Sequence, residues 1–181
     1  KGSAMPKLIE DVKKKILDTT KELLLSEGYG ALTLRIVAKK CGIAVGTIYN
    51  YYSSKNMLVA SVMMEDWQMA LEKMSDGFCF SHSVKDGFET IYNAIVDFGL
   101  IYEVVWFQFS MAENGNVQKE IRDRHQMLRK QISNKMKDVL VMFGKEINEG
   151  QIDLLAEAVL AAAMEPDIDF QAVADVIVHL F

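Results

Sequence analysis

The sequence is poor in the residues that interrupt regular structure. Among its 181 residues are only 2 prolines and 11 glycines, whereas half of all residues are hydrophobic. Disordered and loop-rich chains have the opposite composition, so both are excluded and a helical fold is favoured. The two cysteines, Cys41 and Cys79, are too few and too far apart for a disulfide framework or a metal knuckle. A reducing cytoplasm is the simplest setting for them.

Long hydrophobic runs are also missing. Runs such as Val159–Met164 are far shorter than the ~20 apolar residues that a membrane-spanning helix needs. The N-terminus carries charges but no apolar segment of the kind found in signal peptides. We therefore expect a cytoplasmic protein that does not bind membranes. Residues 1–5 are expected to be disordered or a remnant of an expression tag.

The motifs of catalysis are absent as well. The chain has no glycine-rich dinucleotide loop, no P-loop, no GxSxG and no HExxH. Its three histidines, His82, His125 and His179, are scattered, and each is expected at the surface or in packing. The sequence therefore predicts no enzyme, no catalytic residue, no metal site and no cofactor.

Charge is divided unevenly along the chain. Residues 1–55 contain ten Lys and Arg against five Asp and Glu, whereas residues 56–181 contain ten against twenty. The first part is therefore net positive and the second net negative, although the whole chain is at −5. A basic region beside an acidic one can orient toward DNA while the acidic part stays away from it. Ordinary fluctuation of surface charge is the alternative.

A short stretch before residue 56 has the pattern of two helices joined by a tight turn. Thr33 can cap the first helix with its hydroxyl, and Gly42 can end it in a left-handed conformation. The second helix is expected over about Val45–Tyr52. Ile48 and Tyr52 lie four residues apart and form its only core-facing pair. Such a helix exposes most of its surface, which is typical of helix-turn-helix DNA recognition.

The same stretch resembles a known family. The segment LTLRIVAKKCGIAV, followed by GTIYNYYSSK, is similar to the DNA-binding domain of TetR-family transcriptional regulators, and the resemblance covers about Lys13 to Leu58. It implies an all-α fold, with a three-helix DNA-binding domain over residues 1–55 and a helical effector-binding and dimerisation domain over residues 56–181. It also implies a homodimeric repressor that a small, largely apolar effector releases from a palindromic operator. The alternative is a regulator whose second domain only dimerises or binds a protein partner.

The exposed face of the second motif helix carries the candidate base contacts. Thr47 could contact a phosphate or a thymine methyl group, and Asn50 either pairs with adenine or reaches only the DNA backbone. Gly46 either permits close approach of the backbone or fits the geometry of a helix start. By resemblance, phosphate contacts come from aromatic and basic residues and from the start of the first helix. The complete predicted DNA-binding set is Thr33, Arg35, Val45, Gly46, Thr47, Tyr49, Asn50, Tyr51 and Lys55.

Helical periodicity continues beyond the motif. The aromatic stretch Tyr102–Ala112 could also be a buried strand, but no second convincing strand exists to pair with it, so a helix is expected. A helix over about 8–26 is expected to be ended by Gly28 and Gly30. Another is expected to begin at a cap, Ser53 or Ser54, and to run to about 74, with a break at Asp76-Gly77. Further helices are expected to begin at a capping box at Ser83 and to span 117–143, 151–164 and 169–181.

Two further surfaces are predicted in residues 56–181. An apolar effector cavity is expected, with ordinary core packing as the alternative for each of its residues. A dimer seam of two helices from each protomer is expected near the C-terminus, where apolar surface exceeds what one domain needs. The predicted pocket residues are Trp67, Tyr92, Phe98, Tyr102, Trp106, Phe107, Phe109 and Met111. The predicted dimer residues are Leu155, Val159, Ala162, Val173, Val176, Ile177 and Leu180.

Overall fold

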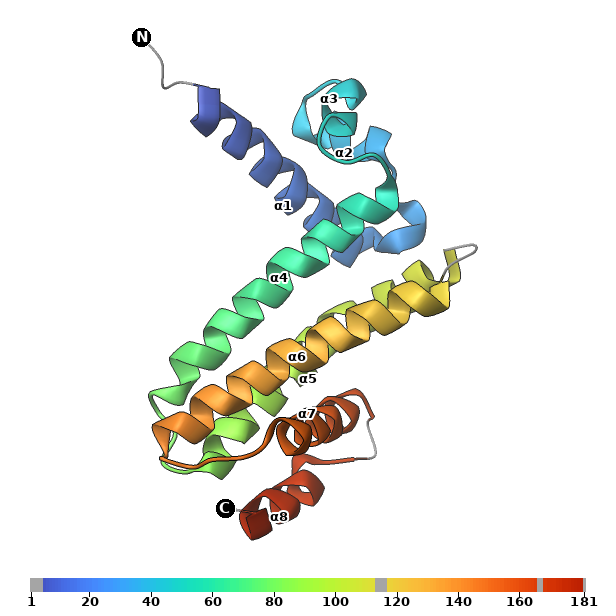
Figure 1. The fold of residues 1–181 in the computed structure, drawn as a ribbon. Helices are drawn as coiled ribbons and strands as arrows, with labels where there is room; N and C mark the ends of the chain where they lie inside the picture. Colours follow the sequence, from blue (N-terminus) through green and yellow to red (C-terminus); the bar gives the residue numbers. More distant parts are fainter. Residues whose placement is uncertain (1–4, 113–116, 166–167, 181) are drawn as a thin grey trace. The chain divides into compact units, whose positions relative to one another are not determined.

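The computed structural model describes residues 5–112, 117–165 and 168–180, and these residues form eight helices and no strand (Figure 1). The predicted all-α fold is therefore confirmed, and Tyr102–Ala112 is helical. The helices are α1 (Met5–Ala31), α2 (Leu34–Cys41), α3 (Val45–Tyr49), α4 (Lys55–Phe78), α5 (Val84–Ala112), α6 (Val117–Met142), α7 (Glu149–Met164) and α8 (Phe170–Leu180).

Local signals begin α2 and α5, and end α2, where the sequence predicts. The Thr33 hydroxyl accepts a hydrogen bond from the N–H of Ile36 at 3.2 Å, and Gly42 ends α2 with φ 67°. At the start of α5, the Asp86 N–H donates to the Ser83 hydroxyl at 3.1 Å. The Asp86 carboxylate in turn accepts from the N–H of His82 at 3.0 Å. These bonds, that of Ser83 first, lower the pKa of Asp86 and confirm the capping box.

Three helix ends differ from the prediction. Helix α4 does not break at Asp76-Gly77 but continues to Phe78. The reason for Gly77 is packing, since a Cβ there would lie 2.7 Å from Cγ2 of Thr90 on α5. Helix α1 kinks at Gly28 (φ 80°) and then resumes to Ala31 instead of ending. Helix α3 ends at Tyr49, three residues earlier than expected.

The chain forms two compact units whose boundaries run through α4 and α5. The N-terminal unit contains Lys1–Asp66 and Tyr102–Glu113, and the C-terminal unit contains Trp67–Ile101 and Asn114–Phe181. Both long helices therefore contribute residues to each unit. The functional division expected at residues 55 and 56 stays a prediction.

The N-terminal unit has a small apolar core. Ile16, Leu23 and Leu32 are each at most 1% exposed, and Ile48 of α3 is fully buried. Tyr52 is 3% exposed, and its hydroxyl has no hydrogen-bond partner in the described part of the chain. Burial raises the pKa of Tyr52 to about 12, so this hydroxyl stays neutral. The predicted core pair, Ile48 and Tyr52, is confirmed.

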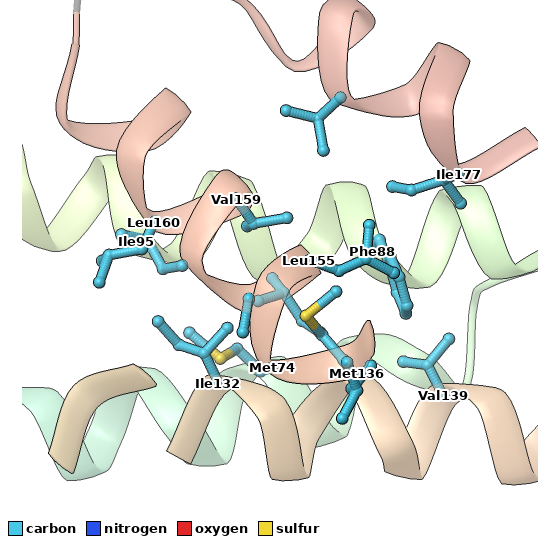
Figure 2. Close-up of a cluster of buried hydrophobic side chains, with 14 of the residues drawn as sticks. Met74, Phe88, Ile95, Ile132, Met136, Val139, Leu155, Val159, Leu160 and Ile177 are labelled. Atoms are coloured by element: carbon cyan, nitrogen blue, oxygen red, sulfur yellow. The ribbon is translucent and has the colours of Figure 1, made fainter. Parts of the chain in front are cut away.

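The C-terminal unit is built around a larger apolar cluster to which α4, α5, α6, α7 and α8 all contribute (Figure 2). Phe88, Ile132 and Val159 are fully buried, as is Met136. Gly87 allows α5 and α6 to approach closely, because a Cβ there would lie 2.4 Å from Cγ1 of Val139. Apolar packing therefore holds this unit together.

Polar contacts also join α6 to α7. Three acidic residues of α7, spaced four apart and therefore on one helical face, point toward α6. Each finds a hydrogen-bonding or basic partner there. The pairs are Glu149 with Lys137, Asp153 with Ser133 (2.7 Å) and Glu157 with His125 (2.8 Å). Because Lys137 and His125 of α6 pair with acidic residues of α7, these two basic side chains form part of the packing of the C-terminal unit.

Candidate nucleic-acid interface

Helix α3 turns only one side chain into the core. Ile48 is the one buried residue among its five. On the other side, Val45 is 36% exposed and Tyr49 is 56% exposed, and Asn50 is exposed directly after the helix. Thr47 is half-buried. The outward face of α3 is therefore available to a groove of a nucleic acid.

Helix α2 supports α3 from the core side. Its buried residues Leu34, Val37 and Ala38 repeat at helical spacing, and Cys41 is 2% exposed. The turn between the helices is closed by the N–H of Ile43, which donates to the carbonyl of Ala38 at 3.0 Å. Two helices joined by a tight turn, with Gly42 in the left-handed conformation, form a helix-turn-helix.

The predicted contacts at the two helix starts lie on exposed positions. Thr33 and Arg35 are exposed at the start of α2, where Thr33 also serves as the cap. Gly46 is exposed, and a Cβ at this position would have no atom within 4 Å. No crowding within the chain therefore requires a glycine at Gly46. Close approach of DNA backbone to this position stays a prediction that the open space favours.

Lys55 is placed differently from the other predicted phosphate contacts. Its amine donates a hydrogen bond to the carbonyl of Tyr29 and lies 3.8 Å from the centroid of the Tyr29 ring. Burial lowers the pKa of Lys55. A phosphate would therefore compete with Tyr29 for this amine. The role of Tyr29 was not predicted, although an aromatic residue between Gly28 and Gly30 is a sequence signal for a bend that packs on the core.

Basic side chains are exposed on α1 and α2 of the N-terminal unit. Lys13, Lys14 and Lys15 of α1 are exposed, and Lys39 is exposed on α2. Lys40 is also exposed, and its amine lies 3.5 Å from a carboxylate oxygen of Glu27. Exposed pairs of this kind contribute little energy in water, so this positive charge remains usable for attraction to phosphates.

Comparison with known proteins supports this interface. Residues 16–62 match the family model for bacterial regulatory proteins of the TetR family. The transcriptional regulator UidR of Escherichia coli K12 is 20% identical over 92% of this chain and 82% of its own length. The chain belongs to the TetR family. It is therefore a DNA-binding transcriptional regulator of the helix-turn-helix type.

Two further comparisons are informative. The transcriptional repressor KstR of Rhodococcus jostii is 39% identical over 56 residues, which are 31% of this chain and 26% of KstR. The crystal structure of the regulator FadR from Bacillus subtilis in complex with stearoyl-CoA superposes with a TM-score of 0.62 at 16% identity, covering 92% of this chain and 96% of FadR. The second likeness concerns the fold alone.

The predicted effector-pocket residues of this TetR-family regulator do not all lie together. Trp67 and Phe98 make an edge-to-face contact at 5.1 Å, and the Trp67 indole donates to Gln131 at 2.7 Å. Tyr92 instead packs on Phe170 of α8, with ring centroids 5.2 Å apart. Tyr102 belongs to the N-terminal unit. The side chains of Trp106, Phe107, Phe109 and Met111 lie outside the described residues.

Most of the predicted dimer residues are core residues of the protomer. Among the seven, only Val176 is described as exposed, at 52%, and the side chain of Leu180 lies outside the described residues. Between α7 and α8 there is an apolar groove of about 300 Å³. It is lined by Leu155, Ala158, Ala161, Ala162, Ile168, Ala172, Val173 and Val176. The buried predicted residues are Leu155, Val159, Ala162, Val173 and Ile177.

Neither a metal site nor a membrane segment is found in the described ranges. No group of three or more His, Cys, Asp or Glu side chains there could hold a metal ion. None of the described helices is both long enough and apolar enough to span a bilayer.

Proposed function

We propose that this TetR-family regulator is a cytoplasmic homodimeric repressor, which a small, largely apolar effector releases from a palindromic operator. The observation that carries the proposal is the surface of α3. It buries Ile48 alone and leaves Val45, Tyr49 and the adjoining Asn50 exposed. A helix of this kind gains few contacts from its own chain, so its exposed residues are free to be selected for DNA.

The apolar groove between α7 and α8 supports dimerisation. Leu154, Met164 and Val176 expose 71%, 57% and 52% of their surface on these two helices. Small side chains line the groove, among them Ala158 and Ala161, which permit close approach of a second helix pair. The occupant that we propose is a second copy of this chain. A two-fold dimer would present two α3 helices and thereby favour a palindromic DNA site.

The relatives support the mode of regulation. KstR is a repressor, and FadR of B. subtilis has been crystallised with stearoyl-CoA. An effector with a long apolar portion would also suit the aromatic residues of the C-terminal unit, such as Trp67 and Phe98. The second candidate is a regulator without a small-molecule effector. The packing of Trp67 directly against Phe98 favours it, because these two rings fill space by themselves.

In vitro selection of bound duplexes from a random pool tests the DNA-binding part. We expect a palindromic site whose half-sites lie on one face of the duplex, bound by two protomers. Val176→Asp should yield a monomer by sedimentation and weaken binding to the selected duplex strongly, since one protomer contacts one half-site. Val141→Asp is the matched control, because Val141 is 77% exposed on α6 outside the groove. A dimer that survives Val176→Asp would contradict the proposed interface.

Thermal stability and DNA release test the effector part. The protein would be heated with stearoyl-CoA, shorter acyl-CoA esters and aromatic apolar compounds, each at a fixed concentration. A true effector should raise the melting temperature of the protein and also release the selected duplex. Uniform failure of the compounds, with DNA binding intact, would instead support the regulator that lacks a small-molecule effector.

A further inference from the structure

A buried carboxylate joins three helices of the N-terminal unit. Asp66 on α4 is only 8% exposed. One of its oxygens lies 2.7 Å from the amine of Lys21 on α1, and the other accepts a hydrogen bond from the Tyr102 hydroxyl on α5 at 2.5 Å. All three residues belong to the N-terminal unit. Asp66 therefore connects α1, which packs on the helix-turn-helix, with α5.

The two partners of Asp66 are not interchangeable. Lys21 supplies a charge at the edge, with 36% of its side chain exposed, whereas Tyr102 is 2% exposed. Burial, followed by the hydrogen bond to Asp66, raises the pKa of Tyr102, so its hydroxyl remains a donor at neutral pH. A buried carboxylate that loses one of its two partners keeps its desolvation cost, so its remaining contacts must rearrange.

A second polar contact joins the same part of α5 to α1. The side-chain oxygen of Gln108 accepts a hydrogen bond from the N–H of Tyr29 at 3.1 Å, just after the kink at Gly28. Tyr29 is itself fixed to the start of α4, because its carbonyl accepts from Lys55 and its hydroxyl contacts Asn56. Helix α5 is thus linked to α1 at two points, directly through Gln108 and indirectly through Tyr102, whose partner Asp66 on α4 pairs with Lys21.

We infer that Tyr102, Asp66 and Gln108 are positioning residues for DNA binding: together they set the position of α1, and with it the helix-turn-helix, according to the position of α5. Helix α1 contacts α2, and the Cys41 thiol of α2 lies 3.7 Å from the carbonyl of Lys15. Helix α5 begins at Val84 in the C-terminal unit. A shift of α5 would therefore alter the contact of Gln108 with Tyr29 and the contact of Tyr102 with Asp66. The inference rests on DNA binding by the chain and requires no particular effector.

Binding of single variants to the duplex obtained by selection tests the inference. Tyr102→Phe removes one hydroxyl and should weaken binding by about fivefold or more, the lower end of typical coupling between sites. The physical reason is that the variant populates the arrangement of α1 that can bind DNA less often, and a smaller binding-competent fraction raises the apparent Kd. The matched control is Thr90→Val, which removes a hydroxyl that donates to the carbonyl of Asp86 at 3.0 Å in the C-terminal unit. It should leave the Kd unchanged.

A double-variant cycle separates this role from general stability. Asp66→Asn should weaken binding by a similar factor, and Tyr102→Phe should then add less than about twofold, since both act through one carboxylate. Gln108→Met tests the second contact with little risk to folding, because Gln108 is exposed. Gln108→Met should weaken DNA binding even at temperatures well below its melting temperature, where the variant is fully folded.

The outcomes are distinct. Unchanged Kd values for Tyr102→Phe and Gln108→Met, with wild-type binding intact, would overturn the inference alone. Additive effects of Tyr102→Phe and Asp66→Asn would likewise overturn it, because the two residues would then act independently. Failure of the wild-type protein to select any duplex would overturn DNA binding, and both proposals with it.

Discussion

Helices α3 and α7 differ in how much of their surface the chain itself covers. Helix α3 buries one of its five residues, Ile48, whereas α7 buries six of its sixteen. The position of α3 therefore depends on its supports, namely α2 and the turn at Gly42, and its remaining side chains are free to contact a ligand. The position of α7 comes from apolar packing, so its exposed apolar residues are a surplus that a second protomer can cover.

The same contrast holds for the two units. In the N-terminal unit, a small apolar core is supplemented by polar contacts around Asp66 and Tyr29, and such contacts are directional. In the C-terminal unit, an extended apolar cluster joins five helices. Hydrogen bonds depend on distance and angle, so the contacts of Asp66 and Tyr29 would be lost if a helix shifted by about an ångström.

The largest expected effect distinguishes the two faces of α3. Ile48→Ala should lower the free energy of unfolding by about 2–5 kcal/mol, because it leaves a cavity at a fully buried site. Asn50→Ala, the matched exposed change, should alter it by less than about 0.5 kcal/mol. Urea unfolding measures both. Asn50→Ala should also change base preference at one position of each half-site. An equal loss of stability in both variants would contradict the one-sided burial of α3.

The next effect concerns close packing in the C-terminal unit. Gly87→Ala should lower the free energy of unfolding by about 1–3 kcal/mol, because the added Cβ meets Val139. Adding Val139→Ala should recover part of that loss by making room. Gly30→Ala in α1 is the control, since a Cβ there has open space. It should stabilise the protein by about 0.5–1 kcal/mol. A stabilising Gly87→Ala would show that the α5–α6 contact is looser than described.

A smaller effect is expected from the unpaired hydroxyl in the N-terminal unit. Tyr52→Phe should raise the free energy of unfolding by about 1 kcal/mol, because it removes a buried polar atom that has no partner in the described residues. DNA affinity should not change, since Tyr52 is 3% exposed. Thermal unfolding and DNA titration measure the two quantities. A clear loss of stability would reveal a hydrogen bond to this hydroxyl.

The smallest effect is the pH dependence of the α6–α7 contacts. Hydrogen bonds from Lys137 and Ser133 lower the pKa values of Glu149 and Asp153 from 4.5 and 3.8 respectively. Since the folded pKa values are depressed, this stabilisation is complete above about pH 4.5 and is lost as pH falls through the lowered values. The double variant Glu149→Gln, Asp153→Asn should therefore differ from wild type in melting temperature at pH 7 and much less at pH 2. The exposed Glu146→Gln is the control, and a difference independent of pH would contradict this account.

Much of the fold follows from local signals. Thr33, Gly42 and Ser83 begin or end helices through contacts within four residues, which a linear sequence displays directly. The exposed face of α3 was also predictable, because the spacing of Ile48 and Tyr52 leaves the remaining residues outside. The family resemblance depends on the same short segment.

Other features depended on residues far apart in the chain. The sequence could not show that Gly77 is needed for packing, because the residue that it faces, Thr90, lies on a different helix, α5. The sequence interpretation of a break there was therefore wrong. The aromatic residues looked equivalent, yet Trp67 packs on Phe98 whereas Tyr92 packs on Phe170. Apolar periodicity indicates that a residue is buried but does not say against which helix.

The sequence by itself determined that this chain is helical, that residues 33–55 form a helix-turn-helix, and that its N-terminal part is basic. Each of these follows from helical spacing, caps or composition within a short window. Only the tertiary structure decided that Asp66 lies between Lys21 and Tyr102, and that Lys55 contacts Tyr29. Partners that are 26 to 45 residues apart meet only when whole helices pack, and local patterns carry no record of that pairing.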